Sequence, residues 1–236
     1  MMPFPFGEER FLLFSDAAWG NAAKGGSQGA FLITVVDEQV FSGQQGRMSI
    51  VQWKSGRVRR VCVSSLAAET LSLVNALNHL EWARCFWSEI TDAGFRLQNW
   101  EEHVGKNSFV CATDAKSIYD HISKPTVSVG ADKRAAIDLQ FVREVLARDG
   151  SVLKWIDGRY QLADDLTKLN TGDLIRGAMR EAKIMLTHET EALRRRERER
   201  DRRRQVSASK SSELREAKLK RLDKLQKALW SWSSMN

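Results

Sequence analysis

The order of its strand-like and helical segments is what most limits the folds open to this chain. Three strand-like segments, at 11–16, 29–36 and 47–55, follow one another with only short turns between them, "KGGSQG" and "DEQVFSGQQG". This spacing predicts an antiparallel meander. From 65 to about 91 leucines recur at helical spacing, with Ser64 or Ser65 as the N-cap residue and Gly94 marking the end.

The second half of the chain alternates strand and helix. A strand at 108–113 precedes a short helix at 115–122 that stops at Pro125. An amphipathic helix follows at 131–150, then a strand at 151–156 and a helix from near Gln161. Together the segments predict an α/β fold, with a five-stranded mixed sheet that is antiparallel in its first three strands and flanked by helices.

The charge of the chain is unevenly distributed. Residues 191–236 hold 15 of the 37 Lys and Arg residues but only 7 of the 30 Asp and Glu residues, so the rest of the chain is nearly neutral. We therefore expect three parts: an N-terminal lead at 1–10, a folded domain at 11–170 and a basic extension at 171–236. The extension is predicted to be helical or partly disordered and to tether nucleic acid, or to be a solvated helix that binds nothing in particular.

Two helical patterns stand out within the extension. Residues 171–193 form a helical pattern with a modest apolar face. Leu222, Leu225, Leu229 and Trp232 recur at helical spacing, so the segment 211–232 is a candidate for pairing with a protein partner.

The compartment is also predicted from the sequence. No apolar run is long enough to cross a bilayer, and the N-terminus lacks a signal pattern, so we expect a soluble intracellular protein without a membrane partner. Cys62, Cys85 and Cys111 each lie in an apolar stretch and are expected to be buried, reduced thiols.

Four acidic residues lie where a strand ends or a helix begins: Asp16, Glu69, Asp114 and Asp164. The carboxyl ends of strands are where open α/β sheets place their sites. Four converging carboxylates cannot all stay ionised without a counter-charge, and hard divalent cations prefer oxygen ligands. A two-metal carboxylate site is typical of enzymes that cut or transfer phosphodiesters.

Each acid also has a simpler interpretation. Asp16 is explained as a turn residue, Asp114 as an N-cap, and Asp164 and Asp165 as acids favoured by a helix dipole. Glu69 shares a helix face with Leu66 and Leu73, so it points toward the sheet unless it reaches solvent from the first turn. The occurrence of all four acids at such positions in one chain favours a functional site.

Five sequence blocks occur in the order of a known family. They are "FSDAAWG", "VQWKS", "SSLAAET", "CATDAKSI" and "QLADDLTK", joined by a sixth segment, "QFVRE". Over residues 11–169 the chain resembles the ribonuclease H domain of copia-type (LTR) retrotransposon polyproteins. The resemblance implies a ribonuclease H-like fold and a magnesium-dependent endonuclease that hydrolyses the RNA strand of RNA–DNA hybrids.

The resemblance also implies roles for individual residues. Asp16, Glu69, Asp114 and Asp164 match the family's catalytic metal ligands: Asp16 would bridge two Mg²⁺ ions, Glu69 and Asp114 would complete one site, and Asp164 the other, with Mn²⁺ as a substitute. The partners would be an RNA–DNA hybrid and a reverse transcriptase. Candidates for nucleic-acid contacts are Ser15, Asn21, Ser64, Ser65, Arg159 and Lys168.

The chain departs from the family in three places, one of which is a longer strand-loop region after the first block. A histidine and an aspartate of the family are missing from 133–140, and Ala115 replaces the asparagine after the third acid. These losses favour the alternative of a catalytically weak or inactive nucleic-acid-binding or scaffold module of the same fold. An adaptor acting through 211–232 is a further alternative. An integrase or transposase of the same fold is disfavoured, because in those enzymes the acids occur in the order Asp, Asp, Glu, whereas the glutamate of this chain comes second.

Overall fold

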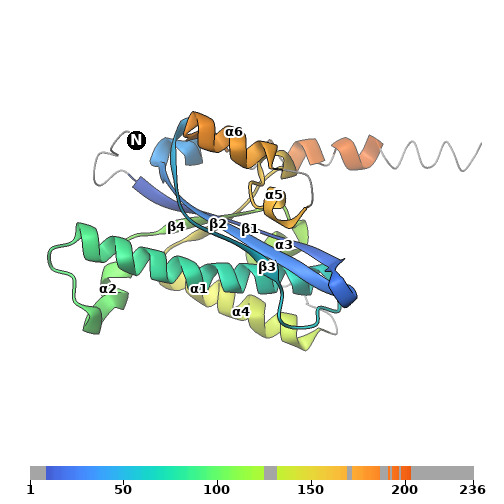
Figure 1. Cartoon of the computed structure of the whole chain (residues 1–236), viewed down its shortest axis with the longest axis horizontal. Helices are drawn as coiled ribbons and strands as arrows, with labels where there is room; N and C mark the ends of the chain where they lie inside the picture. The colour runs from blue at the N-terminus through green and yellow to red at the C-terminus, as the bar shows by residue number, and fades with distance from the viewer. Residues whose placement is uncertain are drawn as a thin grey trace, which may run out of the picture. The chain divides into compact units, whose positions relative to one another are not determined.

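The computed structural model describes residues 9–124, 132–168, 172–186, 191, 193–196 and 198–202. The chain divides into two compact units, Met1–Ala192 and Leu193–Asn236. The first unit holds a mixed β-sheet with helices on both faces (Figure 1). In the second unit, the described residues are helical, and Arg195 pairs with Glu199 one turn later at 3.3 Å.

Six strands form the sheet in the order β5-β4-β1-β2-β3-β6. The strands are β1 (Glu9–Ala22), β2 (Gly26–Asp37), β3 (Gly46–Arg57), β4 (Phe109–Thr113), β5 (Val152–Trp155) and β6 (Lys183–Ile184). Strands β1, β2, β3 and β6 pair antiparallel, whereas β4 pairs parallel with β1 and with β5.

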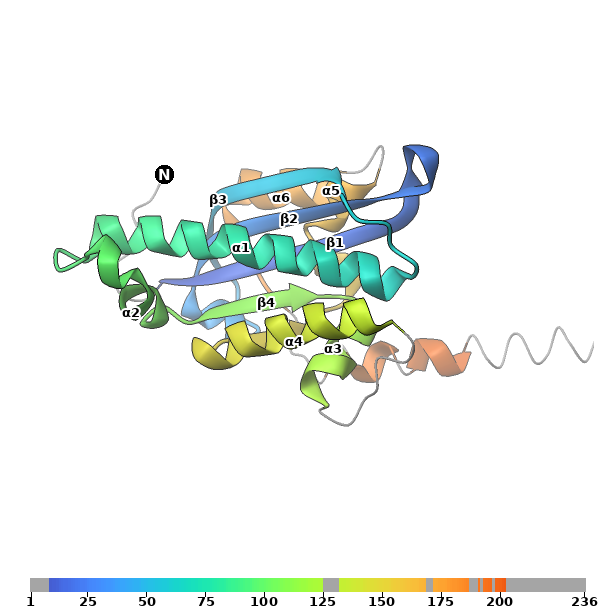
Figure 2. The same ribbon diagram turned by 90° about the horizontal axis from the view of Figure 1, so that it is seen from below.

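Six α-helices are described in the first unit, most of them on the two faces of this sheet. They are α1 (Ser65–Thr91), α2 (Trp100–Gly105), α3 (Lys116–Ser123), α4 (Lys133–Arg148), α5 (Asp164–Thr167) and α6 (Asp173–Glu181). Helices α1 and α4 run along one face, and α5 and α6 lie on the other (Figures 1 and 2).

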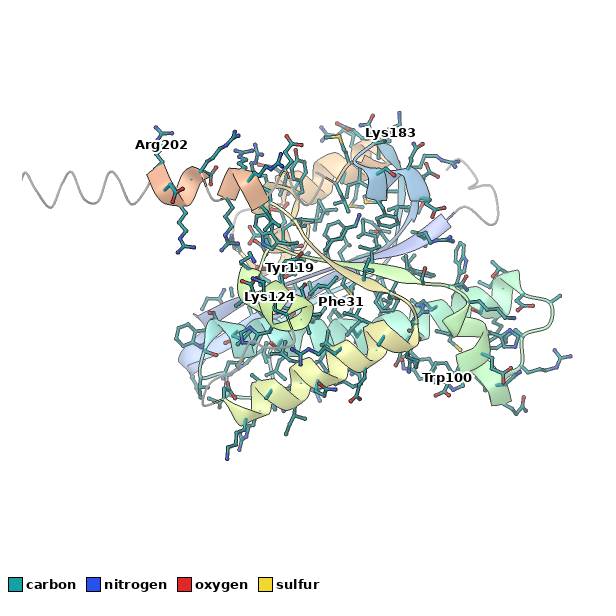
Figure 3. The ribbon with its side chains drawn as sticks, turned by 180° about the vertical axis from the view of Figure 1, so that it is seen from behind. Phe31, Trp100, Tyr119, Lys124, Lys183 and Arg202 are labelled. Carbon is teal, nitrogen blue, oxygen red and sulfur yellow. The ribbon has the colours of Figure 1, made fainter. Side chains whose placement is uncertain are left out.

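Successive apolar side chains of a strand point to opposite faces of the sheet, so a hydrophobic core forms on each face. In β1, Phe11 and Leu13 join the cluster that packs against α1 and α4. Leu12 and Phe14 point the opposite way and join the cluster on the other face of the sheet. Phe31 of β2 belongs to the first cluster and lies between the sheet and the helices (Figure 3).

Helix α1 is anchored closely against the end of β1. Ser64 is its N-cap residue, and the Ser64 side chain accepts a hydrogen bond from the amide of Ala67 at 3.1 Å. Ser72 Oγ donates to the carbonyl of Asp16 at 2.9 Å. Gly29 permits this approach, because a Cβ there would lie 3.0 Å from Ser72 Oγ. The contact fixes the first turns of α1 beside Asp16.

The mixed α/β class and the antiparallel arrangement of the first three strands are confirmed, but the prediction of five strands is wrong. The predicted helix over 171–193 ends at Glu181, because Ala182 takes a left-handed conformation with φ 51° and starts a sharp turn. The chain then returns as β6 beside β3. The first compact unit thus includes segments beyond residue 170.

The prediction of three buried thiols is also wrong, although all three are free. Only Cys111, in β4, is fully buried. Cys62 lies in the loop after β3, where no strand partner covers it, and Cys85 faces partly away from the sheet on α1. No helix in the described ranges is long and apolar enough to cross a membrane. The candidate partner helix at 211–232 and Pro125 lie outside the described residues.

Candidate active site

Two of the predicted acids lie on neighbouring parallel strands. Asp16 lies in β1 and is only 5% exposed. Asp114 directly follows β4. Because Phe14 is level with Ala112 in the parallel pairing, the same register brings Asp16 level with Asp114. The carboxyl end of the sheet therefore presents two aspartates side by side.

Helices α1 and α5 bring the other two acids to the same place. The carboxylate of Glu69, in the first turns of α1, accepts a hydrogen bond from the backbone of Ala17. Asp164 is the first residue of α5, a helix that packs on β1 and β2. The charges of Asp16, Asp114 and Asp164 all act on Glu69, so the four predicted carboxylates share one electrostatic environment.

This environment strongly disfavours negative charge. Burial, followed by the charges of Asp16 and Asp114, raises the pKa of Glu69 to about 9. Burial raises the pKa of Asp16 to about 6, although a hydrogen bond from Thr167 opposes the shift. Burial also raises the pKa of Asp114. The folded chain thus holds carboxylates whose full ionisation requires additional positive charge.

Three side chains of one segment hold the aspartates in place. Thr167 Oγ1 donates to the carboxylate of Asp16. Gln161 Nε2 donates to Asp114 Oδ1 at 3.4 Å and to the carbonyl of Ser15 at 3.1 Å. Lys168 Nζ forms an ion pair with Asp164 Oδ1 at 2.5 Å.

Gln161 and Thr167 were not among the predicted site residues. Both are buried, with exposed fractions of 0% and 5%. The available signal was their position in "QLADDLTK", the block that carries Asp164. Asp165, beside Asp164 in that block, has a structural contact instead: its Oδ2 accepts a hydrogen bond from the amide of Ile175 at 3.0 Å, near the start of α6.

The predicted nucleic-acid contacts are dispersed around the acids. Ser64 and Ser65 lie at the start of α1, about one turn before Glu69. Asn21 Nδ2 donates to the carbonyl of Thr167 at 3.2 Å, which ties the end of β1 to α5. Lys168 interacts electrostatically with Asp16 and Asp114 as well as with Asp164.

Two other predicted contacts have local roles. Arg159 bonds to Asp157 at 3.2 Å in the turn after β5. Strand alternation places Ser15 with Phe11 and Leu13, on the opposite side of β1 from Asp16. Its hydroxyl is buried without a hydrogen-bond partner among the described residues.

The four acids offer the ligand atoms that divalent cations prefer, but their side chains are not arranged around a metal position. All four offer carboxylate oxygens, which Mg²⁺ and Mn²⁺ prefer, and their mutual repulsion favours added positive charge. Within the described ranges, however, no group of three or more His, Cys, Asp or Glu side chains is arranged to hold a metal ion. Thr167, Gln161 and Lys168 each engage one of the carboxylates instead.

The raised pKa of Glu69 predicts a pH dependence of stability. Between its ordinary pKa of 4.5 and about 9, Glu69 holds a proton in the folded state that the unfolded chain releases. In EDTA, this residue therefore makes the free energy of unfolding fall as pH rises through that window. We expect Glu69→Gln to raise the Tm more at pH 8 than at pH 5, by ~2–4 °C per kcal/mol gained. A Tm difference that stays constant from pH 5 to 9 would contradict this.

No family model matches the chain, and no curated protein matches it. Among solved structures, a ribonuclease H1 from compost, crystallised with an RNA/DNA hybrid, shares 15% identity over 72% of this chain and 99% of its own, at a TM-score of 0.44.

Two further structures are similar to a comparable degree. The ribonuclease H1 of Halobacterium salinarum shares 15% identity over 72% of this chain and 99% of its own, at a TM-score of 0.41. The N-terminal ribonuclease H domain of a Mycobacterium tuberculosis protein shares 13% sequence identity with this chain. The match covers 66% of this chain and 95% of that domain, at a TM-score of 0.42. The sheet of this chain is a three-stranded antiparallel meander followed along the chain by two parallel strands. Such low identities say nothing about its chemistry.

Proposed function

We propose that this protein is a magnesium-dependent endonuclease that hydrolyses the RNA strand of RNA–DNA hybrids, and that it derives from a copia-type retrotransposon. One observation carries the proposal: four carboxylates from β1, β4, α1 and α5 act on one another at the carboxyl end of the sheet. A fold alone would not require this cluster, which is costly to bury. The residues are Asp16, Glu69, Asp114 and Asp164.

In this proposal the four acids hold the cations, and their neighbours hold the acids. Bound Mg²⁺ would supply an activated water and charge stabilisation at the leaving oxygen. Thr167 and Gln161 orient Asp16 and Asp114 through their hydrogen bonds. Glu69, whose pKa is raised to about 9 by burial and by the neighbouring acids, would give up its proton on holding a cation. Metal uptake is therefore expected to release protons.

A basic groove beside the acids supports an anionic, polymeric substrate. The groove is about 530 Å³ and is lined by Gly29 of β2, by α1 and by the end of β3. Gly29 pairs with Ala17, the residue after Asp16. The cationic side chains that line the groove are Lys54, Arg57, Arg59 and Arg60. Such a row of charges suits a phosphate backbone.

Hybrid recognition would combine this groove with contacts near the cluster. Ser64, Ser65 and Asn21 border the acids and offer groups that could meet 2′-hydroxyls, the feature that distinguishes RNA from DNA. Lys168 and Arg159 offer positive charge. We further propose that the basic C-terminal extension adds salt-dependent affinity, and that a reverse transcriptase supplies the hybrid.

The test is cleavage by the full chain. With Mg²⁺, we expect it to cut the RNA strand of a labelled hybrid and to leave double-stranded DNA of the same sequence intact. Asp114→Asn should lower the single-turnover rate by at least about 10²-fold, since each tenfold corresponds to ~1.4 kcal/mol of lost transition-state stabilisation. Equal cleavage rates for the variant and the natural protein would exclude the four acids as the catalytic site.

A second candidate function is a non-catalytic nucleic-acid-binding module. It is favoured by the absence, within the described residues, of acids already arranged for metal, and by the ion pair of Lys168 with Asp164. Hybrid binding in a gel-shift assay, with no cleavage in either Mg²⁺ or Mn²⁺, would identify this function.

A further inference from the structure

The outward face of α1 changes character halfway along the helix. In the first half its outward positions are polar, with Asn75 and Asn78 exposed. In the second half they are Trp82, Phe86 and Ile90, which are 75%, 61% and 60% exposed. A helix at the surface of a globular domain usually presents polar side chains on that face. The last turns of α1 therefore carry an apolar stripe that the described residues leave exposed.

A second apolar wall lies beside this stripe. After α1 the chain passes through a short 3-10 helix (Leu97–Asn99) into α2, where Trp100 lies (Figure 3). Leu97 is 66% exposed. The groove between α1 and this segment has a volume of about 250 Å³ and is lined by Glu81, Trp82, Cys85, Leu97 and Trp100.

Buried bonds hold the two walls of the groove together. Arg84, on the inner side of α1, donates to the carbonyl of Val104 in α2 and to that of Asn107 just after it. Asp92, at the end of α1, shares a hydrogen bond with His103 of α2 at 2.8 Å. A groove with fixed walls binds a ligand without the cost of ordering its own elements.

The apolar surface here is large for a surface without a partner. From their exposed fractions, Trp82, Phe86, Ile90 and Leu97 together present on the order of 500 Å² of side-chain surface. Contiguous apolar patches of this size mark interaction sites. A groove beside a helix suits one further helix, which inserts the side chains of one face.

The charges around the groove are mainly negative. Residues 81–106 contain five acids and three bases, and one of these bases, Arg84, is buried, whereas the whole chain has a net charge of +7. Glu81 lines the groove. The charge of Glu89 acts on Cys85, another lining residue. The acids therefore border the apolar surface directly.

This acidic border selects among the possible occupants. It repels nucleic acid and anionic lipid, and in a second copy of the chain it would meet the same acids. We propose that the groove between α1 and α2 binds an amphipathic helix of a partner protein, with apolar side chains toward Trp82, Phe86 and Ile90 and lysine or arginine at its edges.

The proposed surface is far from the four acids of the candidate active site. Glu69 lies in the first turns of α1, and Trp82 follows 13 residues later, about 20 Å along the helix. Helix α2 lies beside the last turns of α1, at the end away from α5 (Figure 2). Partner binding would leave the acids accessible, so this inference does not depend on the proposed nuclease function.

Binding of two labelled peptides to the full-length chain tests the proposal. One is an amphipathic helix of about 18 residues with Leu on one face and Lys on the other, and the second has Glu in place of Lys. We expect the Lys peptide to bind in fluorescence anisotropy, and Trp82→Ala to weaken its binding by at least about tenfold. The double variant Glu89→Gln/Glu101→Gln should weaken it by about threefold.

The matched control is Trp53→Ala, which removes a tryptophan of similar exposure, 63%, from β3 and should leave peptide binding unchanged. Thermal melting establishes that each variant is folded. Hybrid cleavage by Trp82→Ala should equal that of the natural protein, so a failure of this inference is distinguishable from a failure of the nuclease proposal.

The outcomes separate the possible occupants. Binding of the Lys peptide that weakens in Trp82→Ala but not in Trp53→Ala would establish the groove as its site. Absence of binding, or equal binding by the two variants, would overturn the proposal. Equally tight, Trp82-dependent binding of the Glu peptide would overturn the assigned charge. Self-association of the natural protein in sedimentation equilibrium, abolished by Trp82→Ala, would assign the surface to a second copy instead.

Discussion

Asp16→Asn is expected to lower hybrid cleavage by about 10³-fold or more, a loss of roughly 4 kcal/mol of transition-state stabilisation. Asp16 is in the middle of the cluster: it bonds to Thr167, and its charge is coupled to Glu69, Asp114 and Asp164. Asparagine keeps the shape of the side chain and the hydrogen bond from Thr167 but loses the charge that, in the proposed function, would bind a cation.

The same substitution is expected to stabilise the metal-free protein. Burial raises the pKa of Asp16 to about 6, so at pH 7.5 the carboxylate is ionised against an environment that disfavours it. Urea unfolding in EDTA should therefore give a higher midpoint for Asp16→Asn than for the natural protein. Loss of activity with a gain in stability distinguishes a functional acid from a structural one.

Asp165→Asn provides the matched control. Asp165 neighbours Asp164, but its carboxylate accepts a hydrogen bond from the backbone amide of Ile175 in α6. Its replacement should leave cleavage within about threefold and change stability by no more than about 1 kcal/mol, as expected for one helix-terminal hydrogen bond. Cleavage by Asp16→Asn at the rate of this control would refute the central role of Asp16.

The sheet was largely predictable because its strands follow simple rules. β1 and β2 each contain a run of apolar residues, β3 mixes apolar and polar residues, and short polar turns join the three; α1 has leucines at helical spacing behind a serine cap. β6 was not predictable. It has two residues, and it exists because Ala182 turns the chain back onto β3. Such a pairing is set by tertiary contact, which leaves no periodic pattern.

Some residues of the candidate site were likewise predictable from the sequence, and others were not. The four acids were found because strand ends and first helical turns mark positions that sequence patterns can locate. Gln161 and Thr167 were missed because their roles depend on bonds to residues far away in the sequence, Asp114 and Asp16. The predicted nucleic-acid contact of Ser15 stays a prediction, and strand alternation points its side chain to the face of β1 opposite Asp16.

Away from the site, Arg84 is the residue whose loss should destabilise the fold most. Its side chain is fully buried on α1 and forms an ion pair with Asp149, at the end of α4, at 2.6 Å. It also donates to the carbonyls of Val104 and Asn107, both at 2.5 Å, and its guanidinium lies 4.8 Å from the ring centre of Phe109. One side chain thus joins two helices to the chain that enters β4.

Arg84→Met is expected to lower the free energy of unfolding by about 3–5 kcal/mol, the usual result of removing one partner of a buried ion pair. Methionine fills much of the space, but two backbone carbonyls and Asp149 lose the guanidinium of Arg84 as a donor. Burial acts to raise the pKa of Asp149, yet the bonds from Arg148 and Arg84 lower it overall. After the substitution only the partly exposed Arg148 remains to hold that charge.

Urea unfolding of three variants measures this contribution. Arg148→Met, which removes the half-exposed partner of Asp149, should cost no more than about 1 kcal/mol. The double variant Arg84→Met/Asp149→Leu should recover part of the loss from Arg84→Met, because it leaves no buried charge unpaired. If Arg84→Met cost no more than Arg148→Met, the buried pair would contribute nothing beyond an exposed one, and the connection between α1 and α4 would have to rest on their apolar contacts alone.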